Sequence, residues 1–251
     1  MNKQTVIKKQ LTADQLAISK IKTAGPFHRI FECGSRDALD GISLLKSIEA
    51  HELHCFECNP DAIALCRKNI ANSGQSDRIK LVSKALSDKT GSCTFYAIDP
   101  CQTITPHEDG NIGASSLLTA NGKFKKEKYV QKAITVEATT LDDYCSTAGI
   151  PCLLWMDLQG AEGMVLDGGK QTLPLVKAIF IEVAFRRAYT GQTLFHEVHK
   201  RLQKHFTMTY LDLGRWPRWP ALYSLIRFGP WNGNALYINK NAQLLKQATQ
   251  L

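Results

Sequence analysis

The sequence predicts an α/β fold built on a mostly parallel sheet. Short runs rich in β-branched and aromatic residues alternate with helical patterns, which is typical of a parallel sheet with helices on both faces. The chain has 251 residues, of which 44% are hydrophobic and 22% are charged. This balance excludes a disordered, collagenous or low-complexity protein, and the length suits one domain with an elaboration.

Seven runs have the composition of strands, and helical patterns separate most of them. The predicted strands cover residues 29–33, 53–58, 79–82, 152–157, 178–183, 206–213 and 235–238. Asp37 can cap a first helix, whose apolar residues from Leu39 to Ile48 recur at helical spacing. Pro60 lies near the first turn of a second helix, and a further helix is predicted over 193–205.

Residues 85–140 interrupt this alternation. Two strand-like runs, TGSCTFYAID and AITVEATT, flank a loop rich in Gly, Asn and Ser. The pattern predicts a hairpin-like insertion over about residues 92–135, after the third strand.

The connection between the last two strands, about residues 214–232, is a second irregular segment. Loops of this length inside a compact domain are usually functional. We expect it to lie over the substrate face, where aromatic rings could contact a sugar and guanidinium groups could pair with a phosphate or carboxylate. A lid or an oligomer contact is the alternative. The residues concerned are Trp216, Trp219, Trp231, Arg215, Arg218 and Arg227.

Net charge and hydropathy indicate which kinds of binding partner are compatible with the chain. The 31 basic and 23 acidic residues give a net charge of +8, which permits an anionic partner without demanding one. No apolar run approaches the roughly 20 residues of a membrane span, and the first segment lacks the apolar stretch of a signal peptide. We therefore expect a cytoplasmic protein without a membrane span.

The eight cysteines are spread over the chain, and most lie in apolar, strand-like runs. They are predicted to be small buried hydrophobic residues. Cys55 and Cys58 form a CxxC pair, but the second pair that a zinc site usually supplies is absent from the sequence. The other residues in this prediction are Cys33, Cys93 and Cys152.

Residues that follow the first two strands favour a nucleoside ligand, because ligands bind beyond the carboxyl ends of open parallel sheets. Gly34 and Ser35 let backbone pass close to a ligand. Glu57 lies 23 residues after Gly34, near the offset of about 20 at which an acidic residue meets ribose hydroxyls. Arg36 and Leu39 replace the later glycines of a dinucleotide motif, so S-adenosylmethionine is favoured over NAD.

The segment MDLQGAEG closes the fourth strand. Asp157 lies at the strand end, and Gly160 lets the backbone turn. Glu162 lies in the first turn of the next helix, where the helix dipole favours a carboxylate. Plain helix capping is the alternative to a catalytic role.

Together these motifs resemble the FkbM family of S-adenosylmethionine-dependent methyltransferases, over roughly residues 28–240. Several motifs occur in the order and at the spacing of the family. They are ECGSRD, FECNPDA, KALSDKTG, GASSL, TTLDDY, DLQGAE, IEV, and Tyr189 with Gly191.

The resemblance implies a Rossmann-like class I methyltransferase fold. Its sheet would have seven, mostly parallel strands, with the last strands antiparallel and an insertion after strand three. The implied organisation is an N-terminal arm or helix (1–27), a methyltransferase domain (28–240) and a C-terminal tail (241–251). In the family pattern, cofactor contacts fall on Glu32, Gly34 and Ser35 beside the methionine part, Glu57 at the ribose, Ala85, Leu86 and Ser87 around the adenine, and Asp157 facing the sulfonium.

The implied reaction is O-methylation of a hydroxyl on a sugar, a glycan or a natural product. Because an alcohol has a high pKa, a positioned base or a divalent metal would help the displacement. The predicted bases are Asp157, Glu162 and Glu182, with His107 a weaker candidate.

Two alternatives remain open. A nucleic-acid ribose methyltransferase would suit the net charge of +8, but no lysine directly follows the fifth strand and no RNA-binding module precedes the domain, so nucleic acid is the less favoured acceptor. A catalytically inactive cofactor-binding scaffold is suggested by the shortened first motif, GSRD, and by Trp155, where the family commonly has a lysine.

Overall fold

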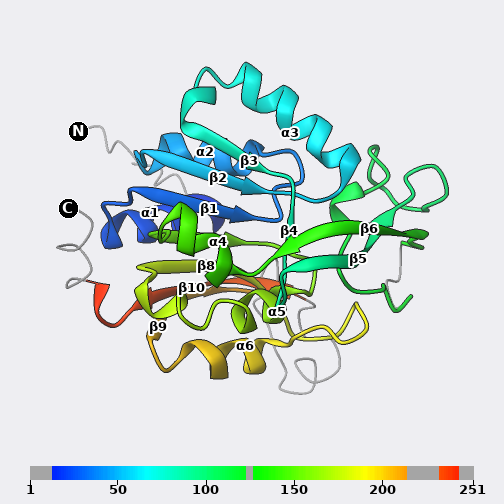
Figure 1. Ribbon diagram of the computed structural model, residues 1–251. Helices are drawn as coiled ribbons and strands as arrows, with labels where there is room; N and C mark the ends of the chain where they lie inside the picture. Colours follow the sequence, from blue (N-terminus) through cyan, green and yellow to red (C-terminus); the bar gives the residue numbers. More distant parts are fainter. Residues whose placement is uncertain (1–12, 123–126, 214–231, 243–251) are drawn as a thin grey trace, which may run out of the picture.

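A central seven-stranded sheet organises the chain in the computed structural model, which describes residues 13–122, 127–213 and 232–242. Its strands are β1 (Arg29–Cys33), β2 (Glu52–Phe56), β3 (Ile79–Val82), β7 (Leu153–Met156), β8 (Ala178–Ala184), β9 (Phe206–Asp212) and β10 (Asn232–Asn239). They lie side by side in the order β3-β2-β1-β7-β8-β10-β9 (Figure 1). β10 runs antiparallel to both of its neighbours, and the other pairings are parallel. The predicted sheet is confirmed, except that of the last two strands only β10 is reversed and β9 runs in the direction of the first five.

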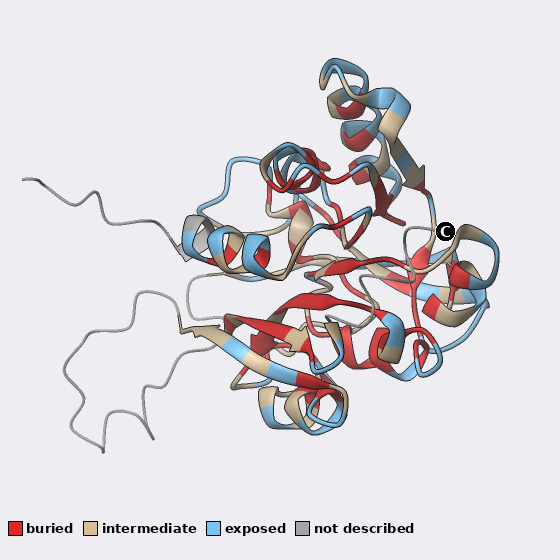
Figure 2. Ribbon diagram, turned by 90° about the vertical axis from the view of Figure 1, so that its left-hand side faces the viewer, coloured by how far each residue is buried: buried red, intermediate tan, exposed pale blue. Residues whose placement is uncertain are grey.

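Helices cover both faces of this sheet. They are α1 (Ala13–Ala24), α2 (Leu39–Ser47), α3 (Pro60–Asn72), α4 (Leu141–Ala148), α5 (Glu162–Asp167) and α6 (Phe195–Leu202), with short 3-10 helices at Ser76–Arg78, Ile112–Ala114 and Leu173–Leu175. Consecutive strand residues enter opposite cores: Ile30 and Leu153 pack with α1 and α2, whereas Phe31 and Leu154 pack with α4, α5 and α6. Burial on both faces explains the continuous apolar runs (Figure 2).

The start of α2 differs slightly from the prediction. The helix begins at Leu39, and the residue before it, Ala38, has a positive φ of 63°. Asp37 still satisfies the first helical N–H, because its carboxylate accepts a hydrogen bond from Leu39 N at 3.0 Å. Ile42 and Ile48 are buried as their spacing predicts, but the Leu39 side chain is 52% exposed. It lines a cleft, which helical periodicity does not reveal.

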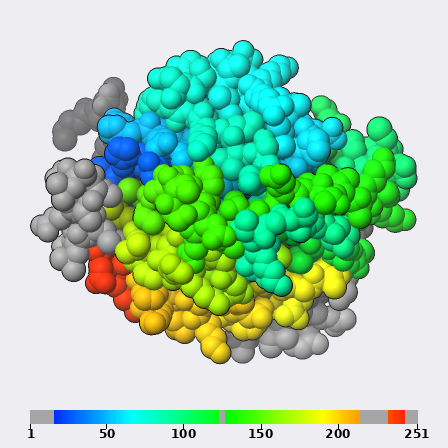
Figure 3. All heavy atoms as spheres, viewed as in Figure 1, coloured from blue at the N-terminus to red at the C-terminus, as the bar shows by residue number. Residues whose placement is uncertain are grey.

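The insertion forms a second, smaller sheet. Its strands are β4 (Ala85–Leu86), β5 (Gly91–Ile98) and β6 (Gln131–Thr139), in the order β4-β6-β5. β5 and β6 pair antiparallel, from Gly91 opposite Ala138 to Ile98 opposite Gln131, so the predicted hairpin is confirmed. The small sheet lies beyond the carboxyl ends of β1 and β2 (Figure 1), and its atoms project from that end of the molecule (Figure 3).

The cysteines are free thiols, and most are buried, as predicted. Cys93, in β5, is the exception among the predicted residues, because it is only partly buried at the surface of the small sheet. Cys55 lies inside β2 and Cys58 follows its end.

Some predictions fall on residues that the structure does not describe. The connection 214–232, with Trp216, Trp219 and Trp231, lies outside the described residues except for Asn232, which begins β10. The domain limits at residues 28 and 240 stay a prediction. Among the helices of the described residues, none is long and apolar enough to cross a membrane.

Candidate active site

The turns after β1 and β7 meet in backbone contact. Gly34 has a φ of 87°, and its N–H donates to Phe56 O at 3.1 Å. A Cβ at this position would overlap the carbonyl group of Asp157. Only glycine fits both the backbone conformation and the space, and this contact brings Asp157 beside the first turn.

Glu57 joins the turns after β1 and β2. Its side chain is 9% exposed. Oε1 accepts hydrogen bonds from Cys58 N and Asn59 N, each at 2.8 Å, and Oε2 accepts one from Arg36 N at 2.8 Å. Burial raises the pKa of this carboxyl, and the backbone donors act in the opposite direction. The carboxylate is thereby held at the edge of a cleft.

The cleft has two parts that share Gly34, Arg36, Gly113, Asp157 and Gln159. The less polar part is lined by Glu57, Ala85 and Leu86, and by residues 112–113 and 115–117 of the insertion. Ser87 is not among the residues that line it: its hydroxyl donates to Asp88 at 3.2 Å and its N–H to Thr139 O at 3.0 Å. Two of the three residues predicted around an adenine therefore reach the cleft.

Glu32 lines the more polar part of the cleft. It is 2% exposed, and its Oε1 accepts a hydrogen bond from Gly41 N at 2.6 Å. Within the described residues, Oε2 has no hydrogen-bond partner. Burial raises the pKa of Glu32 to about 7. Gly41 permits this arrangement, because a Cβ there would lie 2.6 Å from Oε2. Ser35 is buried beside it, and its hydroxyl donates to Glu32 O at 3.3 Å.

The three predicted bases come together at the carboxyl ends of β7 and β8. One oxygen from each of Asp157, Glu162 and Glu182 lies within 4.8 Å of the others. Asp157 is exposed, Glu162 is buried and Glu182 is partly buried. We call these residues the carboxylate triad. Glu162, at the start of α5, is held by hydrogen bonds from Leu158 N at 2.9 Å and Gly160 N at 3.3 Å.

Amide side chains support the two other members of the carboxylate triad. Gln159 Nε2 donates to Asp157 Oδ1 at 2.7 Å, and Asn232 Nδ2 donates to Glu182 Oε1 at 2.6 Å. Sequence reasoning missed Gln159 and Asn232, as it missed Gly41. Asn232 follows Glu182 by 50 residues, so only the pairing of β10 with β8 brings them together.

Desolvation by the surrounding protein raises the pKa of every carboxyl in the carboxylate triad, that of Glu162 to about 7, although Asp157 remains open to the cleft. The charges of Asp157 and Glu162 raise the pKa of Glu182 further. A proton shared between Asp157 and Glu182 therefore resides on Glu182, which leaves Asp157 ionised. An exposed carboxylate among carboxyls of raised pKa can accept a proton near neutral pH, and three carboxylate oxygens at this spacing can also hold a divalent ion.

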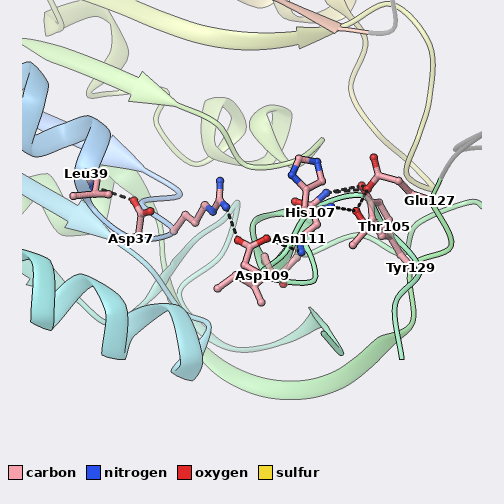
Figure 4. A network of polar contacts seen from close by, with 11 residues as sticks. Asp37, Leu39, Thr105, His107, Asp109, Asn111, Glu127 and Tyr129 are labelled. Carbon is pink, nitrogen blue, oxygen red and sulfur yellow. Dashed lines mark hydrogen bonds and ion pairs between the residues drawn. The ribbon is translucent and has the colours of Figure 1, made fainter. Parts of the chain in front are cut away.

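The insertion forms one wall of the cleft and is held there by polar contacts (Figure 4). Arg36 has a positive φ of 51°, and its guanidinium pairs with Asp109 at 2.5 Å instead of projecting over the turn. Asn111 Nδ2 donates to Glu127 Oε2 at 3.0 Å and to the Tyr129 hydroxyl at 2.9 Å. His107, the weaker candidate base, belongs to this network and is not among the residues lining the cleft.

The strand order, the reversed strand β10 and a cleft at the carboxyl ends define a class I methyltransferase fold, whose cofactor is S-adenosylmethionine. The family model for the methyltransferase FkbM domain matches residues 37–206, and the chain belongs to this family.

One relative and one solved structure are similar to this chain. The chain is 34% identical over 167 residues to the 2-O-methyltransferase NoeI of Sinorhizobium fredii (strain NBRC 101917 / NGR234), a match that spans 65% of this chain and 66% of the relative. The crystal structure of methyltransferase FkbM from Methylobacillus flagellatus KT is similar with a TM-score of 0.50. That match covers 84% of this chain and 43% of the other at 13% identity, so it concerns the fold alone.

Replacing Gly34 tests the contact between the two turns. We expect Gly34→Ala to lower the free energy of unfolding by about 2–4 kcal/mol, because it adds backbone strain to an overlap with Asp157. Urea unfolding measures this change, and calorimetry with S-adenosylhomocysteine should show weakened binding. Gly74→Ala is the matched control, since Gly74 also has a positive φ but no atom within 4 Å of an added Cβ. An equal loss of unfolding free energy in Gly34→Ala and Gly74→Ala would contradict a close contact between Gly34 and Asp157.

The pKa of Glu162 predicts a dependence of stability on pH. The folded-state pKa of about 7 lies above the usual 4.5, so the stability that protonated Glu162 contributes is complete below about pH 4.5 and is lost as the pH rises through about 7. Glu162→Gln removes this titration. Urea unfolding gives the difference in the free energy of unfolding between the variant and the original protein. This difference should rise by about 2 kcal/mol in favour of the variant from about pH 5 to about pH 8. The exposed Glu108→Gln should show no such gain; a flat difference for Glu162→Gln would refute the assignment.

Proposed function

We propose that this chain is an S-adenosylmethionine-dependent O-methyltransferase that acts on a hydroxyl of a sugar or glycan. The observation that carries the proposal is the carboxylate triad, which contributes Asp157 to a cleft that Gly34 and Glu57 also line. The name of the relative, a 2-O-methyltransferase, supports hydroxyl chemistry. Transfer to a hydroxyl needs a group that accepts the hydroxyl proton, and a carboxylate supplies one.

The cleft residues fit the cofactor. At Gly34, the absence of a Cβ leaves room for backbone and ligand to approach closely. Glu32 Oε2 is buried without a partner in the described residues, and it would accept a hydrogen bond from the ammonium of the methionine part. Glu57 would hold the ribose hydroxyls, with Ala85 and Leu86 against the adenine. When bound, S-adenosylmethionine supplies an electrophilic methyl group on a sulfonium.

In the proposed mechanism, Asp157 accepts the proton of the acceptor hydroxyl as the oxygen gains the methyl group. It is the exposed member of the carboxylate triad, and its pKa is raised less than that of Glu182. Glu182, protonated and bonded by Asn232, limits the repulsion on Asp157. Glu162 fixes the turn after β7 through two backbone N–H groups. If a divalent ion is required, the same three side chains would hold it.

The acceptor class can be tested directly. The purified protein is incubated with S-adenosylmethionine and a panel of methyl glycosides, glycans and RNA, and products are analysed by mass spectrometry for a gained methyl group. We expect a product in which a sugar hydroxyl has gained the methyl group. If RNA alone is methylated, the protein is a nucleic-acid methyltransferase and the proposed function is wrong. If the cofactor binds but no acceptor is methylated, a catalytically inactive scaffold is favoured.

Glu57→Gln tests cofactor recognition. Glutamine keeps the length of the side chain but replaces a charged acceptor oxygen by an NH₂ group, so a ribose hydroxyl would lose its charged acceptor and affinity for S-adenosylhomocysteine should fall about 10- to 100-fold in calorimetry. The wild type should not bind NAD. The exposed Asp61→Asn, on the following helix, should bind S-adenosylhomocysteine as the wild type does. Unchanged affinity in Glu57→Gln, with its Tm preserved, would reject the ribose assignment.

Asp157→Asn tests the proposed base. We expect kcat to fall about 10²- to 10⁴-fold, the contribution of a positioned acid–base group, while affinity for S-adenosylhomocysteine and Tm stay close to wild type. Asp77→Asn, at an exposed position, is the control. A chelator separates the two roles of the carboxylate triad. If the chelator abolishes wild-type activity and added Mg²⁺ restores it, the carboxylate triad holds an ion. If the chelator leaves the rate unchanged, Asp157 acts as a base without an ion. Wild-type turnover in Asp157→Asn would remove it from the mechanism.

A further inference from the structure

A chain of hydrogen bonds connects Asp157 to a buried tyrosine from another part of the sequence. Gln159 Nε2 donates to Asp157 Oδ1 at 2.7 Å, and the Tyr189 hydroxyl donates toward Gln159 Oε1 at 3.2 Å and toward Ala114 O at 2.8 Å. Tyr189 is 2% exposed. The amide of Gln159 is therefore held at both of its ends.

The chemistry of the partners fixes the orientation of this amide. An ionised carboxylate only accepts hydrogen bonds, so the NH₂ end of Gln159 must face Asp157. Its oxygen then faces the hydroxyl of Tyr189, which has a proton to donate. Asp157 lies beside Glu162 and Glu182, and a donor on its Oδ1 holds the carboxylate against this crowding.

The backbone of Gln159 is also constrained. Its φ is 51°, a conformation that costs a residue other than glycine about 1–3 kcal/mol and that persists only where the surroundings hold it. The hydroxyl of Ser116, in the insertion, donates to Gln159 O at 2.9 Å and to Leu158 O at 3.4 Å. The strained backbone of Gln159 is thus held next to the predicted base, Asp157, and it fixes the direction in which the Gln159 side chain leaves the turn.

The insertion is joined to the segment that carries Tyr189. Asn121 N donates to Ala188 O at 2.9 Å, Thr190 N donates to Thr119 O at 2.8 Å, and Ala120 forms a bridge with Tyr189. The loops after β7 and β8 and the insertion therefore meet around Gln159. These contacts lie outside the strands of both sheets.

We propose that Gln159 and Tyr189 are positioning residues that aim the Asp157 carboxylate at the acceptor, with the insertion as their support. The proposal rests on the proposed function, in which Asp157 is the base. Both residues act through Asp157, so their loss should lower kcat far more than it changes cofactor binding.

The first test detects the contact without turnover. In protein labelled with ¹⁵N-glutamine, the side-chain amide signal of Gln159 is assigned by its loss in Gln159→Leu. This signal should shift in Asp157→Asn and in Tyr189→Phe. Tyr144→Phe, in α4, is the matched control, since it also removes a tyrosine hydroxyl from a hydrogen bond, in this case with His54 Nδ1 at 3.0 Å, and it should leave the signal in place. An unmoved signal in the two site variants would overturn the proposal.

The second test uses kinetics with the best acceptor from the panel. Gln159→Glu keeps the length and the acceptor for Tyr189 but loses the donor to Asp157, so kcat should fall about 10- to 100-fold. Tyr189→Phe should lower kcat about two- to tenfold, as expected for one hydrogen bond. In both variants the KM for S-adenosylmethionine should stay within about twofold of wild type. Tyr144→Phe should change Tm without changing kcat.

The outcomes separate the two proposals. A wild-type kcat in Gln159→Glu would refute the positioning role, and so would a rise in cofactor KM without a fall in kcat. If the wild-type protein methylates no acceptor, the proposed function fails, and the NMR shifts alone then decide whether Tyr189 and Gln159 hold Asp157.

Discussion

The candidate site depends on a close backbone contact at Gly34, where the turn after β1 packs against the turn after β7. No side chain fits between this residue and the carbonyl of Asp157, so the distance between the ends of β1 and β7 is set by contact of main chain with main chain. The N–H of Gly34 also binds the end of β2. Three strand ends are thereby held at fixed separations, and the side chains of Glu32, Glu57 and Asp157 acquire their relative positions from the sheet.

The carboxylates in the cleft oppose folding, and the rest of the molecule must offset that cost. Glu32 and Glu162 are almost fully buried, each with a pKa raised to about 7, so their ionised forms are disfavoured in the folded chain. The helices on both faces of the sheet supply apolar burial in two separate cores. The candidate site thus lies where the sheet ends and the apolar contacts no longer reach, which is the usual location of a ligand site in an open parallel sheet.

Local sequence signals predicted the sheet because its strands are buried on both faces and therefore stand out as apolar runs. They also predicted Asp157, Glu162 and Glu182, since each follows or closes a strand whose end could be recognised. The residues that support them were not predictable in this way. Asn232 reaches Glu182 only through the pairing of β10 with β8, and the side chain of Gln159 takes its direction from Tyr189. Periodicity placed Leu39 on an apolar face, but helical spacing carries no information about a cleft.

The seam between the insertion and the loop after β8 bears on how the chain unfolds. The hydroxyl of Tyr189 reaches back 75 residues to Ala114, and that of Ser116 reaches forward 43 residues to Gln159. The seam is held by isolated bridges and single hydrogen bonds, whereas each sheet is held by continuous strand pairing. The seam can therefore open locally while both sheets stay paired. A chain opened in this way would keep nearly all of its secondary structure and have an unaligned Asp157, so activity would be lost before the sheet signal when the protein is unfolded gradually.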